Sequence, residues 1–274
     1  MIDDSDNKSK QDAGHRSSLS RRDALMLGGA TAAAAIFGSS LPGSSRAAST
    51  GPVTSGGQPF EILFTIYPKG TLLDFAGPNE VFTRIPNTKV RFASPEGGLV
   101  TLENGVVFGQ TERIADVART DLLCVPGGPD LTAMRTPEML GHVRRLAEGA
   151  RYVTSICTGS LILGASGVLQ GKRSACHWAC LNLLKDYGAI PDPARIVRDG
   201  RFISGGGVTS GIDFALAVAA EISGPVTAQF AQLLIEYNPE PPFHSGHPKV
   251  ASREVLERVE KELPGAMKGL FKVG

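Results

Sequence analysis

The segment Tyr152-Val153-Thr154-Ser155-Ile156-Cys157-Thr158-Gly159-Ser160 decides the fold of this chain. Its first five residues are apolar or β-forming and predict a buried strand over Tyr152–Ile156. The small and apolar residues that follow predict a helix over Thr158–Ala165. Cys157 therefore lies on the turn between a strand and a helix.

That position suggests a nucleophile, because the same strand–turn–helix geometry presents the serine of G-x-S-x-G hydrolases. We expect the turn to point the Cys157 thiol at solvent. A helix N-terminus favours an anion, so we also expect a depressed pKa for this thiol. The alternative is a buried structural cysteine, which is the usual state of a free thiol.

Outward from this segment, short apolar strands alternate with helices. A mostly parallel sheet covered on both faces is therefore predicted, an α/β sandwich with its site beyond the carboxyl ends of the strands. Predicted strands are Phe60–Ile66, Lys89–Ala93 and Leu122–Val125, with hairpins Leu99–Thr101/Val106–Thr111 and Ile196–Val197/Arg201–Ser204. Predicted helices are Leu72–Arg84, Pro137–Glu148, Ala179–Tyr187, Val208–Ile222, Val226–Ile235 and Glu254–Leu263.

Asp74 is the predicted acid or base, because it follows the first strand and its turn closely enough to reach Cys157. A carboxyl group in that apolar setting has a raised pKa, so it can hold a proton beside the sulfur. The alternative for Asp74 is a charge that complements the helix dipole. Glu80, on the same segment, is a weaker candidate for a supporting role.

Backbone N–H groups for a developing negative charge are predicted at Gly127 and Gly128, which follow a buried strand. Thr158 directly follows the nucleophile. Its N–H is a candidate to complete this oxyanion hole, and its hydroxyl is a candidate to hold water or substrate.

We expect structural roles for most of the remaining histidines and cysteines. His177 is a possible base for Cys157 and a candidate substrate-binding residue, but a partly buried structural histidine is the preferred interpretation. Cys124 belongs to a core strand, and we expect Cys176 and Cys180 to be structural rather than a disulfide or metal pair. His244 and His247 alone do not make a metal site, so no metal is predicted.

The N-terminus has the layout of an export signal. Arg21-Arg22 precedes the apolar run Ala24–Phe37, and Ser45-Arg46-Ala47 is a small-x-small cleavage site. The paired arginines indicate the twin-arginine route, so we expect a periplasmic or extracellular protein with residues 1–50 as signal and linker. A retained anchor is the alternative. Residues 55–274 then fit one domain.

Composition restricts the partners. The chain is 42% hydrophobic with a formal net charge of +1, which supplies a core and no field to attract nucleic acid or an anionic membrane. Neither nucleic acid nor an anionic membrane is therefore an expected partner.

Several motifs together resemble the ThiJ/PfpI superfamily, and within it the isonitrile hydratase branch. They are Leu73-Asp74-Phe75-Ala76-Gly77-Pro78-Asn79-Glu80-Val81-Phe82, Val125-Pro126-Gly127-Gly128, Cys157-Thr158-Gly159-Ser160, Leu169–Trp178, Gly207–Asp213 and Glu236–Phe243. The resemblance covers roughly residues 59–248. It implies a flavodoxin-like sandwich that is usually dimeric. It also implies an enzyme that hydrates a small-molecule substrate, R–N≡C, to an N-substituted formamide without a cofactor. Cys157 would attack the terminal carbon, Asp74 would protonate it or activate water, and Thr158 would assist.

Three features qualify this resemblance. Related proteases carry histidine after the nucleophile, where this chain has Thr158, which argues against proteolysis. Related regulators carry a DNA-binding domain, for which a chain ending at Gly274 leaves no room. An export signal departs from the cytoplasmic location of isonitrile hydratases, so the natural substrate stays open. The alternative function is an exported small-molecule binder or oxidative-stress sensor that uses Cys157.

Overall fold

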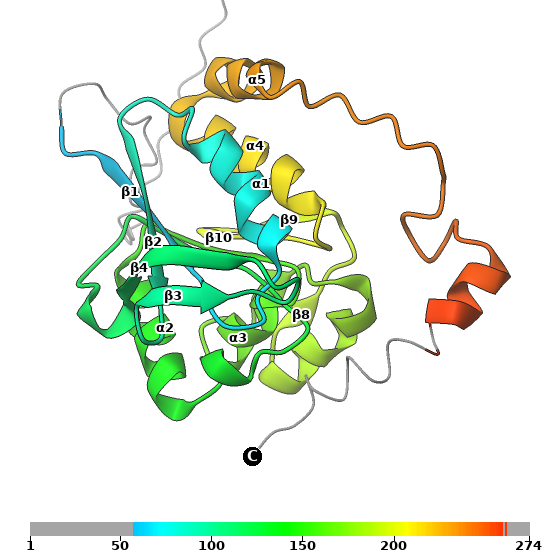
Figure 1. Ribbon diagram of the computed structural model, residues 1–274, viewed down its shortest axis with the longest axis horizontal. Helices are drawn as coiled ribbons and strands as arrows, with labels where there is room; N and C mark the ends of the chain where they lie inside the picture. Colours follow the sequence, from blue (N-terminus) through cyan, green and yellow to red (C-terminus); the bar gives the residue numbers. More distant parts are fainter. Residues whose placement is uncertain (1–56, 260, 262–274) are drawn as a thin grey trace, which may run out of the picture. The chain divides into compact units, whose positions relative to one another are not determined.

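A computed structural model describes residues 57–259 and 261 of the chain (Figure 1). Its eight-stranded sheet has the order β3-β4-β2-β1-β5-β6-β10-β9, and only the edge pairs β3–β4 and β9–β10 are antiparallel. The predicted mostly parallel sheet is therefore confirmed. The strands are β1 (Phe60–Thr65), β2 (Thr88–Ser94), β3 (Gly98–Thr101), β4 (Val107–Arg113), β5 (Leu122–Val125), β6 (Tyr152–Ile156), β9 (Ile196–Asp199) and β10 (Phe202–Gly205), with β7 (Arg173–Ser174) and β8 (Ile190–Pro191) paired separately.

Helices cover both faces of the sheet, which confirms the flavodoxin-like three-layer sandwich (Figure 1). One face carries α1 (Leu72–Phe82), α4 (Ser210–Ser223) and α5 (Pro225–Leu234). The other carries α2 (Pro137–Gly149), α3 (Gly159–Ala165) and the 3-10 helix η3 (Trp178–Tyr187). Two short 3-10 turns, η1 (Ile114–Asp116) and η2 (Thr132–Met134), lie in the loops before and after β5.

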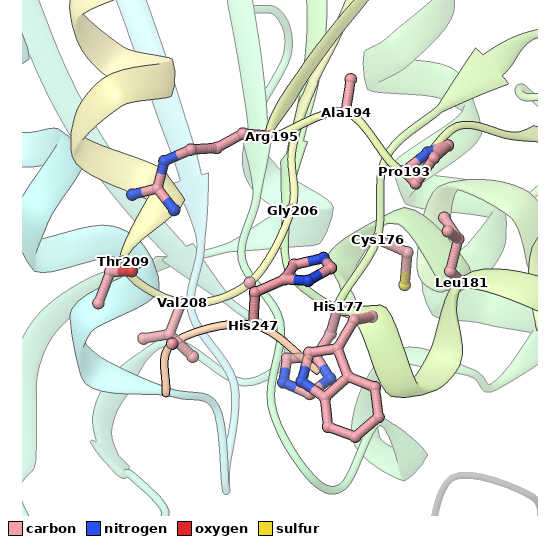
Figure 2. A pocket seen from close by; sticks show the side chains of 13 residues that line it. Cys176, His177, Leu181, Pro193, Ala194, Arg195, Gly206, Val208, Thr209 and His247 are labelled. Carbon is pink, nitrogen blue, oxygen red and sulfur yellow. The ribbon is translucent and has the colours of Figure 1, made fainter. Parts of the chain in front are cut away.

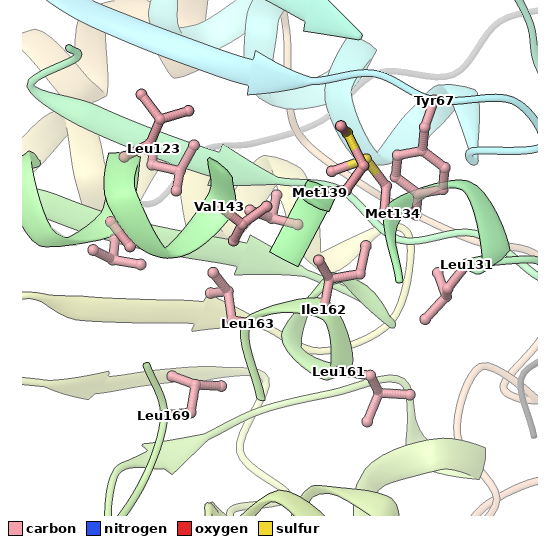
Figure 3. Close-up of a cluster of buried hydrophobic side chains, with 14 of the residues drawn as sticks. Tyr67, Leu123, Leu131, Met134, Met139, Val143, Leu161, Ile162, Leu163 and Leu169 are labelled. Atoms are coloured by element: carbon pink, nitrogen blue, oxygen red, sulfur yellow. The ribbon is translucent and has the colours of Figure 1, made fainter. Parts of the chain in front are cut away.

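Each face of the sheet has its own hydrophobic cluster. Side chains of a strand alternate between the faces, so Leu122 and Cys124 of β5 pack toward α1 and α4 while Leu123 and Val125 pack toward α2 and α3. Figure 3 shows the second cluster, where Leu123 and Val143 meet Ile162 and Leu163. This two-sided burial explains why the central strands are apolar throughout.

Most predicted elements are confirmed to within one or two residues. The segment predicted as helix over Ala179–Tyr187 is helical but of the 3-10 type, since apolar spacing alone does not separate the two helix types. The predicted helix over Glu254–Leu263 is helical at residues 253–259, and its end lies outside the described residues. The signal region also lies outside them.

The carboxyl ends of four parallel strands meet at one edge of the sheet. The loop after β1 binds the loop after β5 through Thr71 N–H and the Gly127 carbonyl, at 2.9 Å. The turn after β6 binds the loop after β10 through Cys157 N–H and the Gly206 carbonyl, at 2.7 Å. The convergence predicted from the strand pattern is therefore present.

Candidate active site

Cys157 occupies a strained elbow between β6 and α3. Its φ of 57° is left-handed, a conformation that is uncommon for residues with a side chain and that recurs at functional sites. Its N–H is held by two carbonyls of the loop after β10, those of Gly205 and Gly206. Its own carbonyl accepts a hydrogen bond from Ser160 Oγ at 3.1 Å. The predicted turn from strand to helix, with Cys157 on it, is confirmed.

The Cys157 thiol is buried, contrary to the expectation that it faces solvent. Only 5% of the residue is exposed. Burial and the neighbouring Asp74 raise the pKa of this thiol well above its usual value, whereas the Thr158 N–H lowers it only in part. The prediction of a depressed pKa was wrong, because desolvation outweighs the N-terminus of a helix only seven residues long.

Asp74 is the buried carboxyl group beside this thiol. It lies in the first turn of α1, the position from which a charge complements the helix dipole, and it is fully buried. Its Oδ2 accepts the Gly127 N–H at 2.8 Å, and its Oδ1 accepts no hydrogen bond from the described residues.

Burial raises the pKa of Asp74 to about 7, against the lowering effect of the Gly127 N–H; Glu103 raises it further, and a hydrogen bond with Cys157 lowers it. A group with this pKa exchanges protons readily at neutral pH.

Gly127 and Gly128 do not present free N–H groups in this structure. The Gly127 N–H donates to Asp74, and the Gly128 N–H donates to Thr158 Oγ1 at 2.9 Å. Thr158 Oγ1 donates in turn to the Gly128 carbonyl at 2.8 Å. The N–H groups expected to form an oxyanion hole are therefore already used in hydrogen bonds. In this structure they form a clamp, that is, they hold the Asp74 and Thr158 side chains in place. The Thr158 hydroxyl serves the clamp, while its N–H faces the sulfur.

Glu80 is not brought together with Cys157. Its side chain is exposed on α1 and pairs with Arg84 at 2.9 Å. Six residues after Asp74, it lies on another side of the helix, because six residues correspond to about 600° of rotation. The supporting role expected for Glu80 is therefore corrected.

His177 is half-buried at the start of η3, where its Nδ1 accepts the Ala179 N–H at 3.3 Å. Burial lowers its pKa, so it is neutral near pH 7. None of the hydrogen bonds or ring contacts found for it in the described part of the chain reaches Cys157. His177 is therefore not placed as a base for Cys157, but it lines the cavity described next, where a substrate-binding residue would lie.

A cavity of about 460 Å³ lies beside the elbow (Figure 2). His177, Trp178 and His247 border it, and Arg195 reaches it from the loop before β9. Gly206, whose carbonyl accepts the Cys157 N–H, forms part of its wall. The cavity therefore adjoins the backbone of Cys157 through Gly206.

The other cysteines are buried free thiols. Cys124 lies in the core of β5, as predicted. Cys176 and Cys180 belong to the cluster on the α2–α3 face, and burial raises the pKa of Cys176 to about 12 and that of Cys180 to about 11. Residues 57–259 and 261 contain no group of three or more His, Cys, Asp and Glu arranged for a metal ion. Within the same residues no helix is long and apolar enough to cross a membrane.

Tyr67 is a residue near the site that no sequence pattern singled out. Its side chain is buried, and its hydroxyl donates to the Pro126 carbonyl at 3.0 Å. The signal available was a tyrosine at the carboxyl end of a central strand, but the direction of its side chain depends on the tertiary structure.

Comparison with known proteins identifies the family and the fold of this chain. The profile of the DJ-1/PfpI family matches residues 61–221. The chain is 43% identical over 209 residues to isonitrile hydratase from Pseudomonas putida, a match that covers 76% of this chain and 92% of that protein. The crystal structure of a ThiJ/PfpI family protein from Pseudomonas syringae superposes with a TM-score of 0.72 at 36% identity, covering 76% of this chain and 89% of that one. Drosophila melanogaster DJ-1beta, at 22% identity and a TM-score of 0.59 over 65% of this chain and 98% of its own, shares the fold.

Proposed function

Since this chain belongs to the DJ-1/PfpI family, we propose that it is a cofactor-independent hydratase that converts an isocyanide and water to an N-substituted formamide. Cys157 is the nucleophile and Asp74 is the acid–base group. The relative from Pseudomonas putida carries the name of this activity and matches most of the chain, which supports the same reaction class here.

The pairing of Asp74 with Cys157 is the observation on which the proposal rests. The thiol has a raised pKa and is protonated at neutral pH, so a nearby base has to remove its proton during attack. Asp74, with a pKa of about 7, lies next to it and has a free Oδ1. One group of this kind can take a proton and return it.

In the first step, the carbon of R–N≡C forms a bond with Cys157 Sγ. Asp74 accepts the thiol proton and delivers it to the same carbon, which gives the thioimidate R–N=CH–S–Cys157. Asp74 is again a carboxylate at the end of this step, so no net proton is consumed.

In the second step, water adds to the thioimidate carbon. Asp74 takes one proton from that water, and a proton passes to the nitrogen to give R–NH–CH(OH)–S–Cys157. The carbon–sulfur bond then breaks, the hydroxyl proton returns to sulfur, and R–NH–CHO leaves. The balance is one isocyanide plus one water to one formamide, with Cys157 regenerated as a thiol.

The cavity beside the elbow is the proposed place for the R group. Trp178, Leu181 and Val208 give it an apolar wall, and its volume of about 460 Å³ suits a small organic substituent. An alkyl or aryl group can pack on this wall, while Arg195, His177 and His247 line other parts of the cavity.

The test is formamide production from a panel of alkyl and aryl isocyanides. We expect turnover by the wild type and none by Cys157→Ala. Cys180→Ala is the matched control, because it removes another buried thiol from η3 and should keep turnover.

Turnover by Cys157→Ala, or a wild type that is folded but inactive on every isocyanide, would overturn the hydratase assignment. In the second case, fast alkylation of Cys157 at neutral pH would favour the binder or sensor function instead. The burial and raised pKa of the thiol argue against that rapid reaction.

A further inference from the structure

A single peptide group connects Tyr67 with Asp74. The carbonyl of Pro126 accepts a hydrogen bond from Tyr67 Oη at 3.0 Å, and the Gly127 N–H donates to Asp74 Oδ2 at 2.8 Å. These two groups belong to the same planar Pro126–Gly127 peptide. The direction of the carbonyl therefore fixes the direction of the N–H.

We propose that Tyr67 is a positioning residue, which locks the Pro126–Gly127 peptide so that its N–H faces the Asp74 carboxylate. The inference rests on the proposed function only in giving Asp74 a role in the reaction. Tyr67 acts through the peptide and needs no contact with substrate.

The lock is needed because the loop itself is permissive. Two glycines in succession impose little restraint on peptide orientation. Neither tolerates a side chain that would supply the restraint. A Cβ on Gly127 would lie 2.5 Å from Thr158 N, and one on Gly128 would lie 2.7 Å from the Lys69 carbonyl oxygen. Hydrogen bonds from neighbouring elements have to hold the loop instead.

The next peptide group is held in the same way. The Gly127 carbonyl accepts the Thr71 N–H at 2.9 Å, and the Gly128 N–H donates to Thr158 Oγ1 at 2.9 Å. The loop after β1 therefore holds the carbonyls of Pro126 and Gly127. The N–H groups of Gly127 and Gly128 donate to Asp74 and Thr158, respectively. Tyr67 is the side chain in this arrangement that substitution can remove.

Tyr67 is suited to be a permanent donor. It is 1% exposed and packs among Leu131 and Met134 (Figure 3). Burial, with Asp74 and Cys157 nearby, raises the pKa of the Tyr67 hydroxyl well above its usual value, so the group keeps its proton. Hydrogen bonds in sequence also polarise each other, which makes the Gly127 N–H a stronger donor to the carboxylate.

Release of the peptide has a definite electrostatic effect. Without Tyr67 Oη, the peptide can turn its carbonyl oxygen toward Asp74, and a carbonyl dipole in that direction disfavours the carboxylate. The titratable groups that face or lie near Asp74 are Cys157 at the elbow, Tyr67 itself, Glu103 in the β3–β4 turn, and Cys124 and Cys176 in the core. Tyr67→Phe leaves all the others in place.

The experiment compares the wild-type chain with Tyr67→Phe by kcat/KM against pH and by the carboxyl infrared band of Asp74, identified from its loss in Asp74→Asn. We expect the acid limb and the titration of the band to move upward by about one pH unit. Activity should recover at high pH with KM little changed. Tyr187→Phe is the matched control, since it removes another tyrosine hydroxyl, bonded to Arg135 at 2.8 Å, and should leave both midpoints unchanged.

An unchanged midpoint in folded Tyr67→Phe, or a uniform loss of activity without a shift, would overturn the positioning role. The infrared titration separates this result from a failure of the hydratase assignment, because it needs no turnover. If Tyr67→Phe does not fold, 3-fluorotyrosine at position 67 keeps the shape and strengthens the donor. The Asp74 midpoint should then move downward, and an upward or absent shift would contradict the inference.

Discussion

Burial in the folded protein makes the ionised form of the Asp74 carboxyl group unfavourable. The pKa of Asp74 is about 7 in the fold and 3.8 as its ordinary value, so between these pH values the native state binds a proton that the unfolded chain has lost. The stability that this proton provides is complete below pH 3.8 and is lost as the pH rises through 7. The ionised group needed for the proposed chemistry therefore weakens the fold.

Asp74→Asn should separate stability from activity. The amide does not ionise, so its stability relative to the wild type should improve between pH 5 and pH 8 by roughly 2–3 kcal/mol. Isocyanide turnover should fall at least about 100-fold, because the acid–base group is gone. Urea denaturation at the two pH values measures the first effect. A pH-independent difference in stability would show that Asp74 is not the group that titrates.

The ionisation of Asp74 should also determine how the kcat/KM of the wild type depends on pH. The carboxylate has to accept the thiol proton, so kcat/KM should fall as the pH drops below about 7. Because Asp74 and Cys157 interact, the observed midpoint belongs to the pair.

At the scale of elements, the elbow depends on how closely α3 approaches β5. A Cβ on Gly159, the first residue of α3, would lie 2.0 Å from the Val125 carbonyl oxygen and 2.8 Å from that of Pro126. Backbone meets backbone here, and no flexible side chain can move aside. The absence of a side chain at Gly159 therefore lets the turn that carries Cys157 approach the end of β5 and the glycine loop Gly127-Gly128.

Gly159→Ala should destabilise the protein by about 3 kcal/mol or more, since the elbow has to shift away from β5. Gly141→Ala in α2 is the matched control. No atom lies within 4 Å of its added Cβ, and alanine favours a helix interior over glycine by about 1 kcal/mol. Thermal unfolding should therefore show a lower melting temperature for Gly159→Ala and a higher one for Gly141→Ala than for the wild type. Equal melting temperatures would contradict the close-packing argument.

At the scale of the whole molecule, one sheet carries two hydrophobic clusters and one candidate site. We propose that residues 1–50 direct the protein through the twin-arginine route to the periplasm or beyond. Replacing Arg21 and Arg22 by lysine should keep the folded protein inside the cell, whereas replacing Lys8 and Lys10 should not. Cell fractionation measures the result, and export by the double lysine variant would contradict the assignment.

The local patterns were informative wherever neighbours in sequence decide the outcome. Short apolar runs identified the central strands, alternation around Asn104-Gly105 identified the β3–β4 hairpin, and topology rules then brought Asp74 and Cys157 to the same edge. Glu80 was misplaced because proximity in sequence to Asp74 does not mean the same side of α1.

The sequence by itself determined the fold class, the position of Cys157 on its turn and the convergence of Asp74 and the glycine loop on the same edge of the sheet, because apolar runs and turn residues are local properties. Only the tertiary structure decided that the thiol is buried and that the glycine loop clamps Asp74 and Thr158. Asp74 and Gly127 are 53 residues apart, and Tyr67 and Pro126 are 59 apart. Desolvation and the orientation of a peptide group depend on such distant partners, whose side chains meet only when the sheet has formed.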